Sequence, residues 1–259
     1  MNTQEKSAPV ILITGASGGL AQEIIRQLPR ESQLILQGRS RQKLEELYSD
    51  LPQVAFFQLD IRDAQAIETF VADIYQTYGR IDYLINNAGF GEFKDFDRFS
   101  NDTIQEMFDV NTLATLHFSR LVGQKMAEAG RGHMITIASM AGLIASSKSS
   151  IYSATKFAVI GFSNALRLEL ADKNVFVTTV NPGPIRTHFF DQADPSGDYL
   201  KSVARFTLEP EDVARRIVKI MGTNKRELNM PFMLKLAAKC YTLFPRISDF
   251  LARKVFNYK

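Results

Sequence analysis

The chain has 259 residues, of which 45% are hydrophobic, and a formal net charge of +3 at pH 7. This length allows one large α/β domain or two small ones, with a sizeable core. The basic excess is small and scattered, so the composition gives no support for nucleic-acid binding. The single cysteine, Cys240, excludes an intrachain disulfide and a cysteine-rich metal cluster, which suits a reducing compartment.

Short apolar runs alternate with longer stretches of helical periodicity along the chain. The runs predict strands at residues 10–15, 33–38, 54–60, 81–89, 132–139, 174–183 and 226–231. Helices are expected at residues 19–28, 41–51, 63–79, 101–129, 150–171 and 209–222. This alternation favours a doubly wound, mostly parallel sheet with helices on both faces and ligands at the carboxyl ends of the strands.

No linker, repeat or low-complexity segment interrupts this pattern. We therefore expect a single domain over residues 1–230, followed by a basic amphipathic helical extension over residues 231–259. The polar N-terminus leads into VILIT, an apolar run too short for the core of a signal peptide. No stretch reaches the about 18 uncharged apolar residues of a membrane-spanning helix, so we expect a soluble cytoplasmic protein.

A glycine-rich turn, TGASGGLA at residues 14–21, joins the first predicted strand to the first predicted helix. Glycines let backbone N–H groups approach a phosphate, and the helix N-terminus adds favourable partial charge. The alternative is a plain βα turn. The second strand ends in QGRS, with Arg39 where a site for NAD usually has a carboxylate. Because arginine offers planar donors to a 2′-phosphate, we expect NADP(H), unless Arg39 is only a solvated loop residue.

Tyr152 and Lys156 lie four positions apart in SSIYSATKFAVIGF at residues 149–162. Alone, such a pair is an ordinary helical neighbour pair. Here it follows TGxxxG at 14–19, NNAG at 86–89 and Ser139 at the end of the fifth strand. With these motifs in order, the sequence resembles the short-chain dehydrogenase/reductase family over about residues 9–187. The resemblance implies a Rossmann fold, a homodimer or homotetramer, and an oxidoreductase that interconverts a carbonyl and a secondary alcohol by hydride transfer.

The resemblance also implies catalytic roles. Tyr152 would exchange a proton with the substrate oxygen, Ser139 would hold that oxygen, and Asn111 would hold a water in the proton relay. Lys156 would bind the nicotinamide ribose and lower the pKa of Tyr152. The chemistry is reasonable, because a free tyrosine has a pKa near 10 and a nearby ammonium favours tyrosinate. Helical i,i+4 spacing places both side chains on one face.

Further matches imply contacts with the cofactor. The positions for its phosphates, ribose, adenine and nicotinamide are Gly15, Ser17, Gly19, Leu20, Arg39, Asp60, Ile61, Asn87, Ala88, Gly89, Pro182, Gly183, Ile185 and Thr187, together with Tyr152 and Lys156. The glycine motif departs from the family pattern at Ala21, where a third glycine is usual. We expect slight repacking of the first helix there, with cofactor binding intact.

The substrate loop, about residues 188–208, follows the NPGPIRT segment. Its aromatic residues, with two more after NNAG, either form an apolar lid and border for the substrate or simply pack beneath the loop: Phe189, Phe190, Tyr199 and Phe206, with Phe90 and Phe93. In the extension, six basic residues accompany one acid, Asp249. It either lies on an anionic membrane surface or packs on the domain or a neighbouring subunit, and packing is the simpler expectation.

Other functions have weaker support. A Ser/His/Asp hydrolase needs a nucleophile elbow, and none accompanies His117, His133 or His188. Three histidines and one cysteine also lack the spacing of a metal site. A non-catalytic NADP(H) sensor or scaffold would not need serine, tyrosine and lysine together. The expected function is therefore a reductase of a small carbonyl compound, with specialisation for lipid-like ketones at a membrane surface as an alternative.

Overall fold

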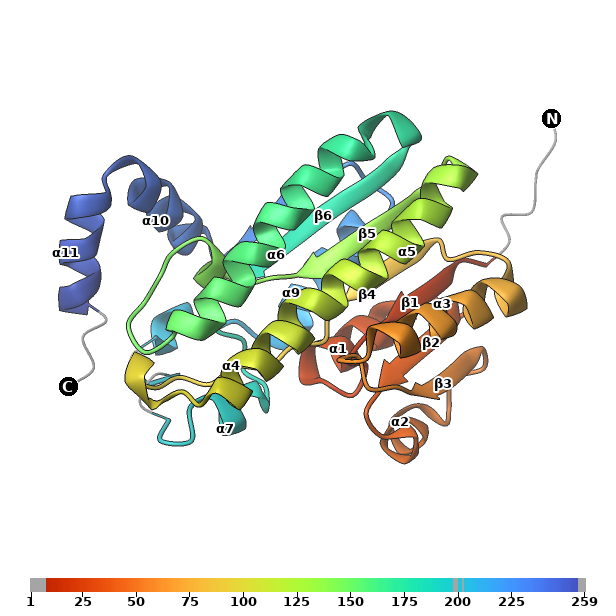
Figure 1. The fold of residues 1–259 in the computed structure, drawn as a ribbon, viewed down its shortest axis with the longest axis horizontal. Coiled ribbons are helices and arrows are strands. Elements are labelled where there is room, and N and C mark those ends of the chain that lie inside the picture. Colours follow the sequence, from red (N-terminus) through yellow and green to blue (C-terminus); the bar gives the residue numbers. More distant parts are fainter. Residues whose placement is uncertain (1–7, 198–199, 202, 256–259) are drawn as a thin grey trace.

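The computed structural model describes residues 8–197, 200–201 and 203–255 (Figure 1). Seven parallel strands form one sheet in the order β3-β2-β1-β4-β5-β6-β7. The strands are β1 (Val10–Ile13), β2 (Gln33–Gly38), β3 (Val54–Gln58), β4 (Tyr83–Asn86), β5 (Gly132–Ile137), β6 (Val175–Pro182) and β7 (Glu227–Met230). The order reverses between β1 and β4, so the predicted doubly wound Rossmann topology is confirmed.

Helices connect the strands and extend the chain beyond the sheet. They are α1 (Gly19–Gln27), α2 (Arg41–Tyr48), α3 (Ala64–Tyr78), α4 (Asn101–Phe108), α5 (Ala114–Ala129), α6 (Ser150–Glu169), α7 (Phe189–Ala193), α9 (Pro210–Ile220), α10 (Phe232–Leu243) and α11 (Pro245–Val255). Within the described residues, no helix combines the length and apolar character needed to cross a bilayer.

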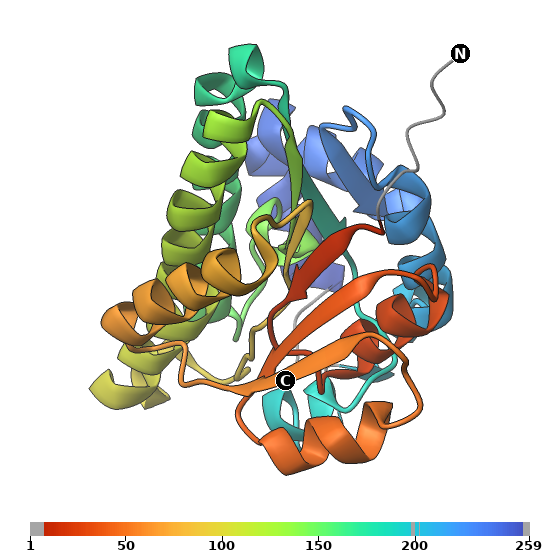
Figure 2. The ribbon, with the colours of Figure 1, turned by 90° about the vertical axis from the view of Figure 1, so that its right-hand side faces the viewer.

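Two apolar cores lie on opposite faces of the sheet (Figure 2). Along β1, Ile11 and Ile13 face the core formed with α1, α2 and α9. Val10 and Leu12 face the core formed with α3 and α5. Successive side chains of a strand point to opposite faces, and both faces here are covered. This explains why the strands read as continuous apolar runs in the sequence.

Polar caps and glycines mark the ends of α3. The Asp63 carboxylate accepts hydrogen bonds from the backbone N–H groups of Gln65 and Ala66, at 2.9 and 3.0 Å. Gly79 ends the helix in the left-handed conformation, with φ of 71°. Aspartate is a preferred residue at the N-terminal cap, where it accepts hydrogen bonds from free N–H groups, and glycine is preferred just after the C-terminus. The predicted range of 63–79 agrees with the observed helix.

Several predicted elements end a few residues earlier in the structure, and two differ more than the others. The helix expected over residues 101–129 consists of α4, a π-helical turn at Asp109–Leu113, and α5. A π turn inserts one extra residue into helical periodicity, so it leaves little trace in the apolar pattern. The strand expected over residues 81–89 covers only Tyr83–Asn86. The remainder of NNAG leaves the sheet and enters the cavity described below.

Candidate active site

A cavity of about 1130 Å³ opens at the carboxyl ends of the strands. It brings together every residue predicted for cofactor binding and three of the four predicted catalytic residues. The lining includes Gly15, Ser17, Gly19, Leu20, Arg39, Asp60, Ile61, Asn87, Ala88, Gly89, Ser139, Tyr152, Lys156, Pro182, Gly183, Ile185 and Thr187. Asn111 is the predicted site residue that does not line it.

The glycine turn and the NNAG segment are locked together beneath this cavity. The Thr14 hydroxyl accepts hydrogen bonds from the N–H groups of Asn87 and Ala88, both at 3.1 Å. The Asn87 amide donates to the Gly15 carbonyl at 3.0 Å. Gly15 has φ of +63°, and a Cβ there would lie 2.8 Å from the Cα of Ala88. The turn therefore requires glycine for both its conformation and its close approach to β4.

The start of α1 lies in the same turn. A Cβ on Gly19 would come within 3.0 Å of the Thr187 side chain, so the absence of a side chain lets the NPGPIRT segment approach the helix. The first N–H groups of α1 have no acceptor within the helix and are suited to a phosphate. Ala21, the departure from the family pattern, is fully buried in the core on the α1 face of the sheet.

Positive charge gathers at the end of the cavity beyond β2. Arg39 and Lys43 line it, and no ion pair of either residue occurs in the part of the chain that the structure describes. Arg62 is different, because it pairs with Asp60 at 2.6 Å and with Glu106 at 3.3 Å. Its hydrogen bonds hold the pKa of Asp60 below the ordinary value. Sequence reasoning missed Lys43, although its place in the first turn of the helix after Arg39 was a usable signal.

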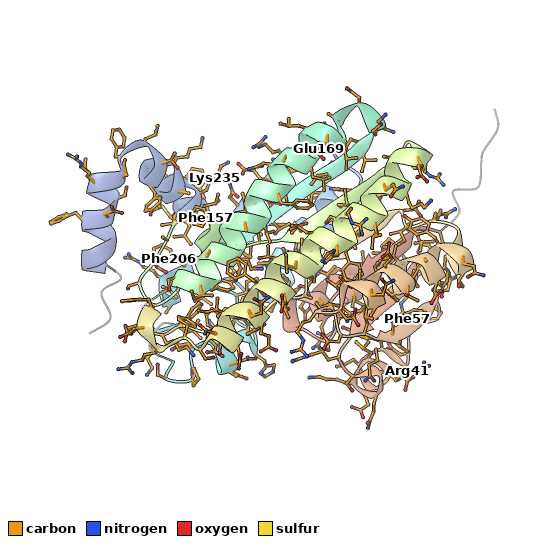
Figure 3. All side chains as sticks on the ribbon, viewed as in Figure 1. Arg41, Phe57, Phe157, Glu169, Phe206 and Lys235 are labelled. Carbon is orange, nitrogen blue, oxygen red and sulfur yellow. The ribbon has the colours of Figure 1, made fainter. Side chains whose placement is uncertain are left out.

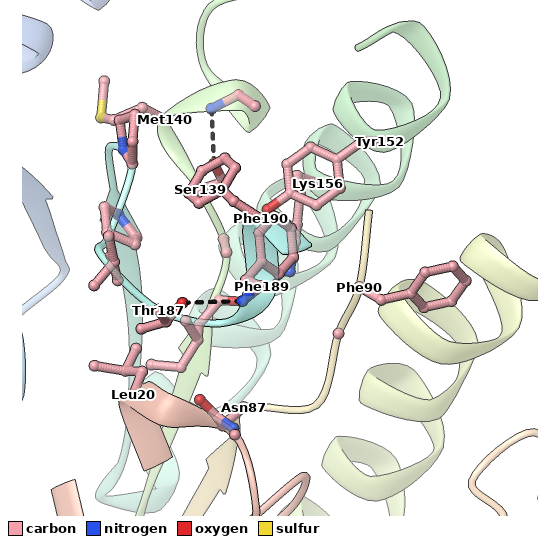
Figure 4. Close-up of a pocket in the computed structure, with 18 of the residues that line it drawn as sticks. Leu20, Asn87, Phe90, Ser139, Met140, Tyr152, Lys156, Thr187, Phe189 and Phe190 are labelled. Carbon is pink, nitrogen blue, oxygen red and sulfur yellow. Dashed lines mark hydrogen bonds between the residues drawn. The ribbon is translucent and has the colours of Figure 1, made fainter. Parts of the chain in front are cut away.

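Ser139, Tyr152 and Lys156 converge at the other end (Figure 4). Ser139 follows β5, and its hydroxyl accepts a hydrogen bond from the Ala141 N–H at 3.0 Å. Tyr152 and Lys156 come from successive turns of α6 and are both buried. The Lys156 Nζ donates to the Ile137 carbonyl at 3.0 Å and lies 5.7 Å from the centre of the Tyr152 ring.

Burial dominates the proton affinities of this pair. It raises the pKa of Tyr152 to about 12, while a hydrogen bond with Ser139 acts in the opposite direction. In the structure, loss of solvent is the largest effect on this pKa, and the expected lowering by Lys156 stays a prediction. Burial lowers the pKa of Lys156 to about 8. Near pH 7 the phenol keeps its proton and the amine is mostly charged.

Asn111 lies behind the cavity on the π-helical turn. Its amide nitrogen donates to the Phe90 carbonyl at 2.8 Å and to the Thr155 hydroxyl at 3.1 Å. Its amide oxygen accepts from the Phe90 N–H at 2.9 Å. These bonds join α5, α6 and the segment after β4, so Asn111 positions the wall next to Tyr152. Its predicted role in holding a relay water stays a prediction.

An aromatic cluster surrounds the Tyr152 ring. The ring centres of Phe93 and Phe189 lie 5.7 and 5.8 Å from it, and Phe190 lies 5.3 Å from Phe189. The predicted aromatic segment thus contributes Phe189 and Phe190 to the substrate end, through α7. Phe90 and Phe206 also line the cavity, whereas Tyr199 lies outside the described residues. Aromatic side chains thus border the Tyr152 ring on the cavity side.

The helix α10 forms a further wall, which the sequence did not predict. Its side chains that line the cavity are Met233, Leu234, Leu236, Ala237, Cys240 and Tyr241. The close approach depends on Gly183, because a Cβ there would lie 2.8 Å from the Leu234 side chain. A usable signal was the position of this apolar segment directly after β7, which pairs with the strand that ends at Pro182.

Among the described residues, no group of three or more histidine, cysteine, aspartate or glutamate side chains is placed to hold a metal ion. His133 is buried in β5, and the exposed His188 pairs with Asp191 at 2.9 Å.

The fold and the cavity together define a dinucleotide-binding α/β protein with a serine, a tyrosine and a lysine at the substrate end. The family model described as short chain dehydrogenase matches residues 9–196, and the chain belongs to this family. An uncharacterised oxidoreductase of Staphylococcus aureus is 31% identical over 224 residues, which cover 85% of this chain and 94% of that protein.

Solved structures agree with this assignment. A short-chain dehydrogenase from Streptomyces avermitilis superposes with a TM-score of 0.82 at 25% identity and covers 97% of this chain and 98% of its own. The closed form of a serine dehydrogenase complexed with NADP+ has a TM-score of 0.78 at 31% identity, over 86% of this chain and 95% of its own. The chain is thus an oxidoreductase of the short-chain dehydrogenase family.

Proposed function

We propose that the protein is an NADPH-dependent reductase that converts an apolar carbonyl compound into a secondary alcohol. One observation carries the proposal: a buried, protonated phenol, Tyr152, lies beside Ser139 and Lys156 at the end of a cavity that begins at a phosphate-suited glycine turn. The solved relative complexed with NADP+ supports the choice of cofactor.

The residues present fit an NADP(H) molecule. Gly15 lines the cavity and holds the turn close to the NNAG segment, since any Cβ there would clash with Ala88. The first turn of α1 offers N–H donors. Arg39 and Lys43 supply positive charge where a 2′-phosphate would lie, and no carboxylate ends β2. When bound, the cofactor supplies the hydride that adds to the carbonyl carbon.

The protein supplies the proton and orients the substrate carbonyl group. Ser139 donates a hydrogen bond to the substrate oxygen, and Tyr152 transfers its proton to that oxygen as negative charge develops. The positive charge of Lys156 stabilises the resulting tyrosinate. One hydride on carbon and one proton on oxygen complete the alcohol. A pKa of about 12 keeps Tyr152 protonated at neutral pH, which is the form that a general acid needs in the direction of reduction.

The aromatic cluster favours an apolar substrate. Phe93 and Phe189 contact the Tyr152 ring, and Phe190 packs against both of them. The proposal also includes a cytoplasmic location and the homodimer or homotetramer that the family resemblance implies. The competing function, an NADP(H)-binding scaffold without catalysis, has no chemical need for Ser139, Tyr152 and Lys156 at one end of the cavity.

The test is turnover of a panel of short- and long-chain ketones, measured by NADPH absorbance. Tyr152→Phe should lower kcat by about 1000-fold, as expected for loss of a general acid, and leave the Kd for NADPH within about twofold. Tyr78→Phe, at the end of α3 and outside the cavity, is the matched control and should keep full activity. Full turnover by Tyr152→Phe contradicts the mechanism, and tight NADPH binding without any turnover favours the scaffold.

A further inference from the structure

The C-terminal helices carry most of the exposed apolar surface. Seven of the eleven large hydrophobic side chains exposed in the described part of the chain lie between residues 232 and 250. Their exposed fractions run from 51% to 71% at Phe232, Met233, Leu236, Leu243, Phe244, Ile247 and Phe250. Figure 1 shows α10 and α11 at one end of the molecule, with α11 standing away from the sheet. Apolar patches of this kind mark interaction sites.

On α10 these side chains form one face. At about 100° per residue, Phe232, Met233, Leu236 and Leu243 fall within about 100° of the helix circumference. The buried Ala238 lies on the opposite side and packs toward the domain. The exposed face is thus a continuous stripe and is distinct from the surface that attaches α10 to the protein.

Basic side chains border this stripe. Lys235, labelled in Figure 3, and Lys239 are both exposed. At about 100° per residue they fall within about 60° of one edge of the stripe. Arg246 is exposed at the start of α11. Residues 231–259 contain six basic residues and one acid, Asp249. An exposed apolar face with basic side chains along its edge is the pattern of a helix that lies on an anionic bilayer.

The charge distinguishes a bilayer from a second copy of the chain. Pairing two copies through this face would bring basic side chains against each other, and lysine is depleted from the centres of protein interfaces. An anionic leaflet instead attracts each lysine or arginine near its surface. The same face would bury its phenylalanine and leucine side chains at the boundary of the acyl chains. The observations therefore favour a lipid surface.

The face is continuous with the cavity. Met233, Leu236 and Cys240 are exposed to solvent and also line the cavity that contains Tyr152. The apolar stripe of α10 therefore extends from the outer surface into the mouth of the substrate end. A ligand that leaves an acyl layer at this face would meet apolar side chains along its path to the aromatic cluster.

We propose that α10 and α11 dock the protein on an anionic membrane surface and that the substrate is a bilayer-dissolved, long-chain carbonyl compound that enters over α10. The second half of the proposal rests on the proposed reductase function. The membrane would contact the outer face of the two helices. Lys235 and Lys239 belong to that face and do not line the cavity.

Docking is tested by sedimentation of the full chain with phosphatidylcholine vesicles, with and without phosphatidylserine. We expect binding that requires phosphatidylserine and weakens with salt. Lys235→Glu/Lys239→Glu should lower the partition coefficient at least about 10-fold. The control Arg216→Glu/Lys219→Glu changes the net charge equally on α9 and should bind as the unaltered chain does. Phe244→Ala/Ile247→Ala should weaken binding, whereas Leu168→Ala, an exposed apolar position on α6, should not.

The proposal is overturned if the full chain does not sediment with anionic vesicles, or if both charge-reversed variants bind equally well. A monomer–dimer equilibrium that Phe244→Ala/Ile247→Ala disrupts, without vesicle binding, would assign the face to a subunit interface.

Entry of the substrate from the bilayer needs a separate test. Lys235→Glu/Lys239→Glu should slow reduction of a long-chain ketone in vesicles by about 10-fold and leave reduction of a water-soluble ketone unaffected. Equal rates on the vesicle ketone refute entry from the bilayer. Sedimentation needs no turnover, so an inactive protein would refute the reductase separately.

Discussion

A buried histidine should make the fold sensitive to mild acid. His133 is 1% exposed in β5, and its Nδ1 accepts a hydrogen bond from the Gly222 N–H at 3.1 Å. The proton therefore lies on Nε2, which donates to the Thr178 hydroxyl at 2.8 Å. That hydroxyl donates to the Lys225 carbonyl. Protonation would place a second donor opposite Gly222, and burial lowers the pKa of His133 to about 4.

The magnitude follows from linkage. An unfolded histidine has a pKa of about 6.5, so between pH 6.5 and 4 the unfolded chain binds more protons than the folded one. The free energy of unfolding is therefore unaffected above this window and falls as the pH falls through it. Between about pH 7 and pH 4.5, this one group should remove about 2.5 kcal/mol.

The assay is urea unfolding across this pH range. The unaltered protein should lose about 2.5 kcal/mol more than His133→Gln, which has no titrating ring. His188→Gln is the control, since that side chain is 95% exposed, and its loss should match the unaltered protein. Equal losses for His133→Gln and the unaltered protein would refute the reasoning. Proton NMR of the His133 ring gives an independent check, because a midpoint near 6.5 contradicts the buried, neutral state.

Three further predictions concern the cavity. Arg39→Asp should raise the Kd for NADPH far more than that for NADH in direct titrations, and equal changes would contradict the 2′-phosphate assignment. Gly15→Ala should lower the free energy of unfolding by about 2 kcal/mol or more and abolish NADPH binding, because strain at positive φ adds to the clash with Ala88. In the same thermal unfolding assay, Gly79→Ala should lower it by only about 1 kcal/mol, because the space around its Cβ is open. Carbonyl reduction should decline as the pH rises through about 8, where Lys156 loses its charge; a flat initial-rate profile from neutral to alkaline pH would contradict a role for that charge.

Local signals in the sequence were sufficient for most of the architecture. Continuous apolar strands alternating with amphipathic helices predict a parallel sheet covered on both faces, and all seven predicted strands are present, although several end earlier than predicted. The π-helical turn at Asp109–Leu113 was not predicted, because one inserted residue hardly disturbs helical periodicity. It matters for the site, since it carries Asn111, whose amide fixes the segment after β4.

Part of the candidate site could likewise be predicted from the sequence, and part could not. Motifs in order along the chain indicated which residues meet at the carboxyl ends of the strands, because the topology of a parallel sheet brings those ends together. The proton affinities of Tyr152 and Lys156 were not accessible, since a pKa depends on how much solvent the packed chain removes.

The sequence by itself thus determined the fold class and the glycine turn, because local spacing along a strand or helix encodes them. It predicted Ser139, Tyr152 and Lys156 as site residues only through the resemblance of its ordered motifs to a known family. Only the tertiary structure decided that α10 completes the cavity wall and presents its apolar face outward. The physical reason is that burial is a property of packing between distant segments, and the amphipathic pattern of a helix does not state which face meets the protein.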